Sequence, residues 1–314
     1  MRFLGLEQSA IAFALINVFL AASYQLPIQG GVFALSGVAF MAIGAYTSAL
    51  LTARFDINPI VALGAAALLP AAVALLLSLP LARLGGLYLA LSTLAFLVVV
   101  DTFLLNAGFT GGAAGLYRIP RYVEMWHLML AVAVLAYLAR SLQRSRIGRA
   151  MVAMRESSAV ASTLGINPSL YRSALFVASG VLAGLAGAFY AHYVGVLTPQ
   201  SFSFSLVVRA LVMALLGGTR HWAGAFMGAA VVTLLPELLR PVREWRDVVF
   251  GALLVALVLF APQGIAGTLD SLMLWARTSL SRWRSLLHQP LLYRSRPKAR
   301  EVALDDPAGD GGSH

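Results

Sequence analysis

Long apolar runs divide this chain, and they constrain its fold more than any other feature. They cover 8–26, 30–53, 59–79, 86–106, 125–140, 173–195, 205–218, 222–239 and 246–262, each bounded by Pro, Gly, Asn or Arg. Most approach the roughly 20 residues that a helix needs to cross a bilayer core. Because the runs are continuous and do not alternate with polar residues, helices are favoured over a barrel. The sequence predicts an all-α integral membrane protein, a polytopic bundle of about 8–10 transmembrane helices.

Composition excludes the soluble classes of protein. Hydrophobic residues make up 60% of the chain and charged residues only 11%, whereas about a quarter of a soluble domain is charged. The absence of cysteine excludes disulfides and thiol catalysis. The histidines form no HxxxH or HExxH pair, so we expect no metal site. The net charge of +10 is typical of arginine-rich cytoplasmic loops. The expected contact is therefore a lipid bilayer and not nucleic acid.

Two residue patterns within the apolar runs predict how the helices pack. Gly180, Gly184 and Gly187 share one helical face, and small faces let helices approach closely in lipid. We favour helix packing over substrate contact for these glycines. Pro70 and Pro236 lie inside apolar runs and should kink their helices.

One polar segment interrupts the apolar runs, RSRIGRAMVAMRESSAVASTLGINPSLYR, residues 144–172. As a single helix it presents a partial apolar stripe of Ile147, Met151, Met154 and Val160, and it should end before Pro168. Two interpretations fit. The helix docks to a soluble partner, or it is an amphipathic loop that lies on lipid headgroups.

This segment also resembles a known family. SRIGRAMVAMRESSAVASTLGIN (145–167) is similar to the cytoplasmic signature of LivM-type branched-chain amino-acid ABC importer permeases, S-R-x-G-R-A-x-x-A-I-R-E-[DN]-E-x-A-A-x-x-L-G-I-N. The stretches LALSTLAF, TGGAAGL, FVASGVLAGLAGAFYAHYVGVLTPQSFSF, MALLGG and FAPQGIAG continue the likeness in order over about 30–267. Ser157 and Ser158 stand where that family often has acidic residues.

The resemblance implies the membrane subunit of a type II ABC importer. Its partners would be a second permease of LivH type, two ATPase subunits and a periplasmic binding protein. The chain itself would bind no cofactor, because it lacks a Walker A pattern and ATP and Mg would belong to the ATPases. The implied ATPase-coupling residues are Arg146, Gly148, Arg149, Ala150, Arg155, Glu156, Gly165, Ile166 and Asn167.

Asp101 and Arg209 are charged residues that lie well inside apolar runs. Ionisable residues at such positions are candidates for function. Relatives usually carry the opposite sign at both places, so we hypothesise an intramembrane ion pair between them; the alternative is that each snorkels to an interface. Val98 replaces the family's usual Glu, which leaves open import of urea, short amides or another small polar solute.

The remaining polar residues near the spans are candidates for the translocation path, although helix–helix hydrogen bonding is favoured for each. They are Ser36, Thr93, Asn106, Thr110, His192 and Tyr193. A secondary transporter would need inverted repeats and coupling carboxylates, and an intramembrane enzyme would need a nucleophile–base pair or a metal cluster. Neither pattern is convincing, so we expect a transport subunit and not an enzyme.

Arginine counting predicts the orientation. With 141–172 in the cytoplasm and about nine crossings, most of the 23 lysines and arginines fall on the cytoplasmic side. We therefore expect a bacterial inner-membrane protein. Its permease domain would cover 1–269 with a coupling loop at 141–172, followed by a basic, partly disordered cytoplasmic tail at 270–314.

Overall fold

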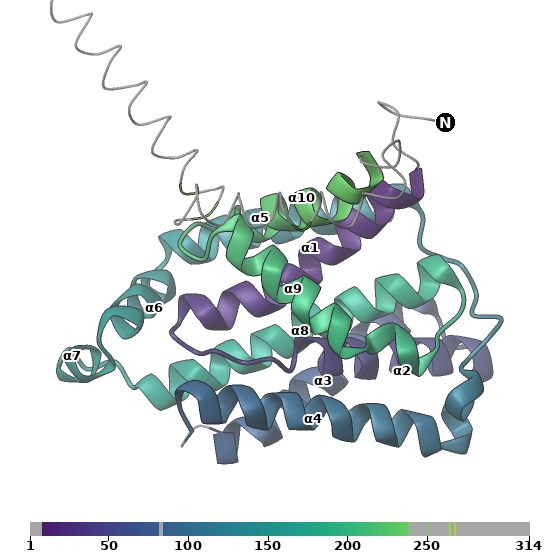
Figure 1. Ribbon diagram of the computed structural model, residues 1–314, viewed down its shortest axis with the longest axis horizontal. Helices are drawn as coiled ribbons and strands as arrows, with labels where there is room; N and C mark the ends of the chain where they lie inside the picture. The colour runs from purple at the N-terminus through teal and green to yellow at the C-terminus, as the bar shows by residue number, and fades with distance from the viewer. Residues whose placement is uncertain (1–7, 82–83, 239–250, 252–263, 265–266, 268–314) are drawn as a thin grey trace, which may run out of the picture. The chain divides into compact units, whose positions relative to one another are not determined.

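The chain folds as a bundle of α-helices (Figure 1). The computed structural model describes residues 8–81 and 84–238 and the single glycines 251, 264 and 267. The helices are α1 (Gln8–Gln29), α2 (Gly37–Arg54), α3 (Pro59–Leu81), α4 (Gly86–Asn106), α5 (Met125–Arg144), α6 (Arg146–Glu156), α7 (Ser158–Thr163), α8 (Pro168–Val194), α9 (Phe204–Gly217) and α10 (Gly224–Leu238), with short 3-10 turns η1 (Gly108–Thr110), η2 (Gly112–Ala114) and η3 (Pro199–Phe202).

Every apolar run within the described ranges contains a helix, although the run 30–53 becomes helical only at Gly37, and this confirms the predicted all-α membrane class. In the part of the chain that the structure describes, six segments are long and apolar enough to cross a membrane: α1, α3, α4, α5, α8 and the η3–α9 segment Pro199–Gly217. Two further runs form the shorter helices α2, of 18 residues, and α10, of 15. The run at 246–262 lies outside the described residues, and so does the expected domain boundary at 269. The basic tail at 270–314 therefore stays a prediction.

Helix α8 is the centre of the bundle, and it packs against α1, α2 and α3. Its small residues make this close contact possible. A Cβ at Gly180 or Gly184 would meet backbone of α3, and one at Gly187 would meet backbone of α2 at Met41. Packing is therefore the role of all three glycines, as the sequence indicates.

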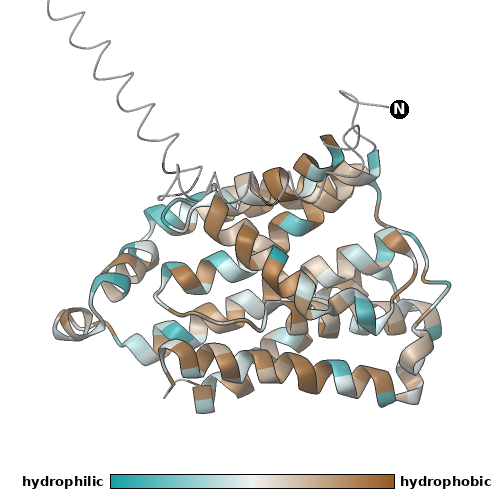
Figure 2. Cartoon of the chain, in the orientation of Figure 1, coloured by the Kyte–Doolittle hydropathy of each residue, from teal (hydrophilic) through white to brown (hydrophobic). Residues whose placement is uncertain are grey.

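Apolar side chains face outward over much of the bundle. Leu68, Leu76, Val99 and Tyr137 are each exposed, on α3, α4 and α5, and Figure 2 shows hydrophobic residues along α4. Exposed apolar surface of this extent suits contact with lipid or another membrane subunit.

The connecting segments fall at two ends of the bundle. At one end lie α6, α7 and the α9–α10 turn, where the Gln143 side chain at the end of α5 donates to the Arg220 carbonyl. At the other end Leu116 pairs with Leu197, and Arg121 donates to the Val194 carbonyl at 2.9 Å. This grouping agrees with the alternation of crossings that the sequence predicts.

Candidate functional site

The polar segment begins with a tight corner between α5 and α6. Ser145 is the N-cap of α6, and its hydroxyl accepts from the Gly148 amide at 3.3 Å. The same hydroxyl donates to the Leu142 carbonyl at 2.7 Å. A Cβ at Gly148 would collide with the carbonyls of Leu142 and Gln143. Gly148 is thus required for the close approach of the two helices at this corner.

The segment is not the single helix that its apolar stripe indicates. It breaks at Ser157, whose backbone is extended, so that α6 ends at Glu156 and α7 starts at Ser158. The Ser157 hydroxyl then caps α7 by accepting from the Val160 amide at 3.3 Å. Ser, Asp and Asn are all good N-caps. A serine where relatives often carry Asp or Asn therefore preserves the local structure.

The Gly-Ile-Asn end of the motif forms the junction between α7 and α8. Gly165 has φ +80°, and its amide donates to the Ser162 carbonyl while the Ile166 amide donates to the Ala161 carbonyl. This is the Schellman arrangement that ends helices. Asn167 then caps α8 by accepting from the amides of Ser169 and Leu170. These three motif residues shape the backbone of the segment.

A small apolar cluster holds the segment against the bundle. Met151, Met154, Ala161 and Leu175 are buried together, with Ile166 packed beside them. Ala150 is also buried. The predicted stripe is thus confirmed at Met151 and Met154. It is wrong at Ile147, which is 47% exposed in the first turn of α6, and at Val160, which is 58% exposed on α7 after the break at Ser157.

Arg155 points inward, toward the turn between α9 and α10. Its guanidinium donates to the Thr219 hydroxyl at 3.1 Å and to the Thr219 carbonyl at 3.4 Å. Since Thr219 follows the end of α9 by two residues, this contact ties α6 directly to a membrane helix. We refer to Gly218–Trp222 as the polar hub.

Two glutamine side chains converge on the same hub from other helices. Gln25 of α1 donates to the carbonyls of Gly218, at 2.8 Å, and His221, at 2.7 Å, and accepts from the Ala225 amide. Gln143 of α5 donates to the Arg220 carbonyl and accepts from the Trp222 amide. The hub therefore connects α1, α5, α6, α9 and α10. No sequence pattern reveals the hub, because its partners lie 64 or more residues apart.

The other motif charges face outward. Arg146, Arg149 and Glu156 are exposed, and the Arg149 guanidinium donates only locally, to the Arg144 carbonyl at 3.2 Å. Leu164, at the end of α7, is 71% exposed. With Val160 these side chains give α6 and α7 an outer face of mixed apolar and basic character.

The six path candidates lie on α4, η1, α8 and the segment before α2. Four of them make local or core hydrogen bonds. Thr93 accepts from the Leu35 amide, Asn106 donates to the Thr102 carbonyl, Thr110 donates to the carbonyls of Leu104 and Ala107, and His192 bridges Ser48 and Pro120. Tyr193 packs edge-on against Phe13, and the buried Ser36 hydroxyl has no partner in this structure. Their role in a path stays a prediction.

His192 shows how such a residue is satisfied inside the bundle. In the neutral ring Nδ1 donates to the Pro120 carbonyl at 2.9 Å, because a carbonyl only accepts. Nε2 then accepts from the Ser48 hydroxyl at 2.8 Å. The ring thus joins α2, α8 and the segment before α5.

Asp101 and Arg209 are placed on different helices. Asp101 is half-buried on α4, whereas Arg209 is exposed on α9. Among the described residues, 8–81 and 84–238, no ion pair joins Asp101 to Arg209. The hypothesised pair therefore has no support within this chain and stays a prediction.

The fold and this segment define a polytopic helical membrane protein with a packed helical connector at one end of the bundle. The chain belongs to the family described as the branched-chain amino acid transport system / permease component, whose model matches residues 8–258. The LivM permease proteins of the high-affinity branched-chain amino acid transport systems of Salmonella typhimurium and Escherichia coli are each 30% identical over 261 residues. The LivH protein of Escherichia coli is 34% identical over 140 residues, 43% of this chain and 45% of its own.

The extent of these matches differs between the two permease types. The alignment to the LivM proteins covers 72% of this chain and 61% of theirs, so the chain spans less than two thirds of those relatives. The resemblance to LivM-type permeases that the motifs indicate is confirmed. No solved structure matches the chain.

Proposed function

We propose that the chain is the permease subunit of an ATP-driven importer of branched-chain or related amino acids. It would form part of the translocation path and couple to a separate ATPase through residues 144–167. The observation that carries this proposal is the connection of α6 to the polar hub through Arg155 and Thr219. A displacement of α6 would reach α1, α5, α9 and α10 through the polar hub and not through lipid.

The division of roles within the motif supports a mechanical function. A lever must be held firmly on one side and offer a contact surface on the other, because it has to bias a two-state equilibrium. Ala150 and Met154 are buried on the inner side of α6. Arg146, Arg149 and Leu164 are exposed on the outer side, where an ATPase subunit would dock.

The complex that fits this arrangement has several partners. They are a second permease of LivH type, two ATPase subunits that bind ATP and Mg, and a periplasmic binding protein. The end of the bundle with α6 would face the cytoplasm of a bacterial inner membrane, because its exposed arginines suit that side. The turn region 107–124 at the other end would face the binding protein. The chain itself would perform no catalysis.

One observation keeps a second substrate class in view. Val98, which replaces the family's usual Glu, is 60% exposed on α4. If that face of α4 meets the partner permease, the path would lack a carboxylate there. Urea, short amides or another small polar solute would then be the cargo of the same machinery. A secondary transporter remains the less favoured alternative.

Reconstitution with the partner subunits tests the function and the substrate together. Proteoliposomes with the chain, its candidate second permease and ATPases are loaded with ATP and given binding protein with labelled leucine, isoleucine or valine. We expect uptake that requires ATP hydrolysis and that excess unlabelled branched-chain amino acid suppresses. Uptake driven by an ion gradient without ATP would overturn the proposal. ATP-driven uptake of urea but not leucine would move it to the second substrate class.

A further inference from the structure

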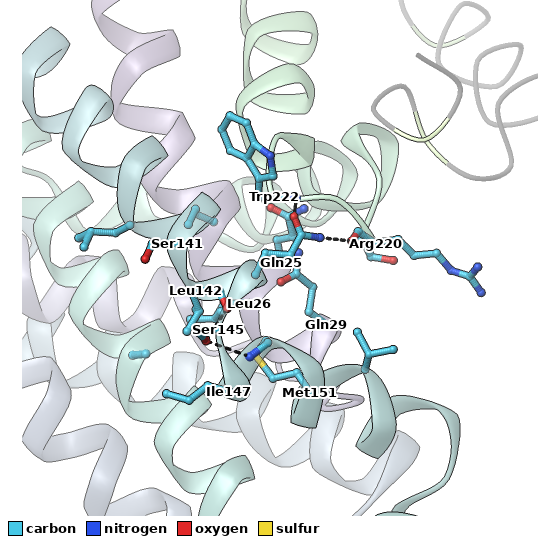
Figure 3. A pocket seen from close by; sticks show the side chains of 18 of the residues that line it. Gln25, Leu26, Gln29, Ser141, Leu142, Ser145, Ile147, Met151, Arg220 and Trp222 are labelled. Atoms are coloured by element: carbon cyan, nitrogen blue, oxygen red, sulfur yellow. Dashed lines mark hydrogen bonds between the residues drawn. The ribbon is translucent and has the colours of Figure 1, made fainter. Parts of the chain in front are cut away.

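A cavity of about 640 Å³ lies between α6 and the rest of the bundle. Its walls come from α1, α5, α6, α8 and the start of α10, and the polar hub closes one side (Figure 3). This volume falls within the roughly 300–1,000 Å³ of pockets that enclose small ligands. The contacts described above explain how α6 is held against the bundle, but they do not say what fills this cavity.

The cavity has an apolar interior. Leu135 and Leu142 of α5, Val181 and Leu182 of α8 and Phe226 of α10 line it. Water gains few hydrogen bonds against such walls, and apolar cavities of this kind bind apolar groups. The interior therefore suits a hydrocarbon chain.

Access to the cavity is from the side of the bundle. Leu138 lines the cavity and is 56% exposed on α5. It continues the exposed apolar face that Leu130 and Val134 form along the same helix. A hydrocarbon chain in the bilayer thus has an uninterrupted apolar route from that face of α5 into the cavity.

The charged residues that line the cavity are mostly basic. They are Arg155 and Arg220, and Glu156 is the one acidic lining residue among those described. The Arg220 side chain extends away from the other labelled residues of the cavity (Figure 3), so its guanidinium lies where a headgroup would be. Arg144, at the nearby end of α5, is also exposed. Basic pockets beside transmembrane helices bind the headgroups of anionic lipids.

We propose that this cavity is a binding site for an anionic phospholipid, with one acyl chain in the apolar interior and the phosphate at the Arg220 rim. The acyl chain would pack between α6 and the bundle, against Met151 and Val152. Such a lipid would help to hold α6 in place. The inference concerns binding and holds whichever solute the protein transports.

Lipid retention by the purified full-length chain tests the site. The chain is exchanged into mixed micelles that contain phosphatidylglycerol and phosphatidylcholine in equal amounts, and bound lipid is counted by native mass spectrometry. We expect phosphatidylglycerol to be retained over phosphatidylcholine. Ala139→Trp fills the cavity from α5 and should abolish this preference, whereas Ala133→Trp, on the same helix but outside the cavity, should leave it unchanged.

A second variant keeps the test sharp if Ala139→Trp fails to fold. Arg220→Gln leaves the backbone carbonyl that Gln143 binds, and it should weaken phosphatidylglycerol retention about fivefold, the effect of one arginine near an anionic lipid. Arg140→Gln, an exposed arginine of α5 that does not line the cavity, is the matched control. Equal retention of the two lipids, or equal losses in Arg220→Gln and Arg140→Gln, would overturn the proposal.

Discussion

Removal of the Arg155 guanidinium should uncouple ATP hydrolysis from transport without dissociating the ATPase from the permease. Arg155→Ala deletes both hydrogen bonds to Thr219, one of 3.1 Å to the hydroxyl and one of 3.4 Å to the carbonyl. The bond of 3.4 Å is weak, so we count only the bond of 3.1 Å. Because Arg155 is half-buried, we use the lower end of the energy range for a charged donor. A hydrogen bond from a charged donor contributes about 1.5 kcal/mol at the lower end of its range. That corresponds to roughly a tenfold shift between attached and detached α6.

The assay is the number of ATP molecules hydrolysed per solute imported in proteoliposomes. The ratio should rise in Arg155→Ala and in Thr219→Val, which removes the hydroxyl but keeps the side chain's shape. The double variant should be little worse than either single variant, because both remove the same contact. Arg155→Lys should restore only part of the coupling, since lysine lacks the planar fork.

Two results would refute this reasoning. Arg140→Ala changes an exposed arginine on α5 and should leave the ratio of ATP to solute at the wild-type value. If Arg155→Ala behaves like Arg140→Ala, the hub contact does not transmit motion. If Arg155→Ala instead prevents the ATPase from co-purifying, Arg155 is a docking residue and not an internal link.

Three substitutions test the local structure of the site by thermal unfolding in detergent. Gly148→Ala should destabilise the protein by about 1–3 kcal/mol because its Cβ meets two carbonyls. The control Gly64→Ala has open space around it and should be neutral or stabilising by up to about 1 kcal/mol. Equal effects of the two substitutions would contradict the tight corner between α5 and α6. Gln25→Glu should destabilise the protein at least as much as Gln25→Leu, because a carboxylate would face two carbonyls to which the amide now donates. If Gln25→Glu leaves stability unchanged, the polar hub is not stabilised by α1. Gly165→Ala should lower the free energy of unfolding by about 1–2 kcal/mol, because alanine disfavours the positive φ at this position. Gly165→Asn should lower it less. Equal losses in the two variants would argue against the left-handed turn.

The spans were predictable because each is a continuous apolar run, and lipid leaves a helix as the main way to satisfy the backbone of such a run. The break at Ser157 was not predicted, because the apolar stripe of Met151 and Met154 continues to Val160. The pair of serines was the available signal, since serine is a common N-cap.

The polar hub was beyond reach of the sequence alone. Gln25, Gln143 and Arg155 carry no shared motif, and each meets the α9–α10 turn across a long stretch of chain. Family resemblance marked Arg155 as important but implied a contact with the ATPase. The structure places its guanidinium on Thr219 instead, so one motif residue acts within the chain while neighbours such as Arg149 face outward.

The central claim is that the outer face of α6 and α7 docks the ATPase, and co-purification measures this most directly. Membranes that co-express the candidate ATPase with the wild-type chain, Arg149→Glu or the control Arg140→Glu are solubilised, and the ATPase that remains bound is quantified. We expect Arg149→Glu to lose the ATPase and ATP-driven uptake together, while Arg140→Glu keeps both. Unchanged assembly and unchanged uptake in Arg149→Glu would contradict this claim.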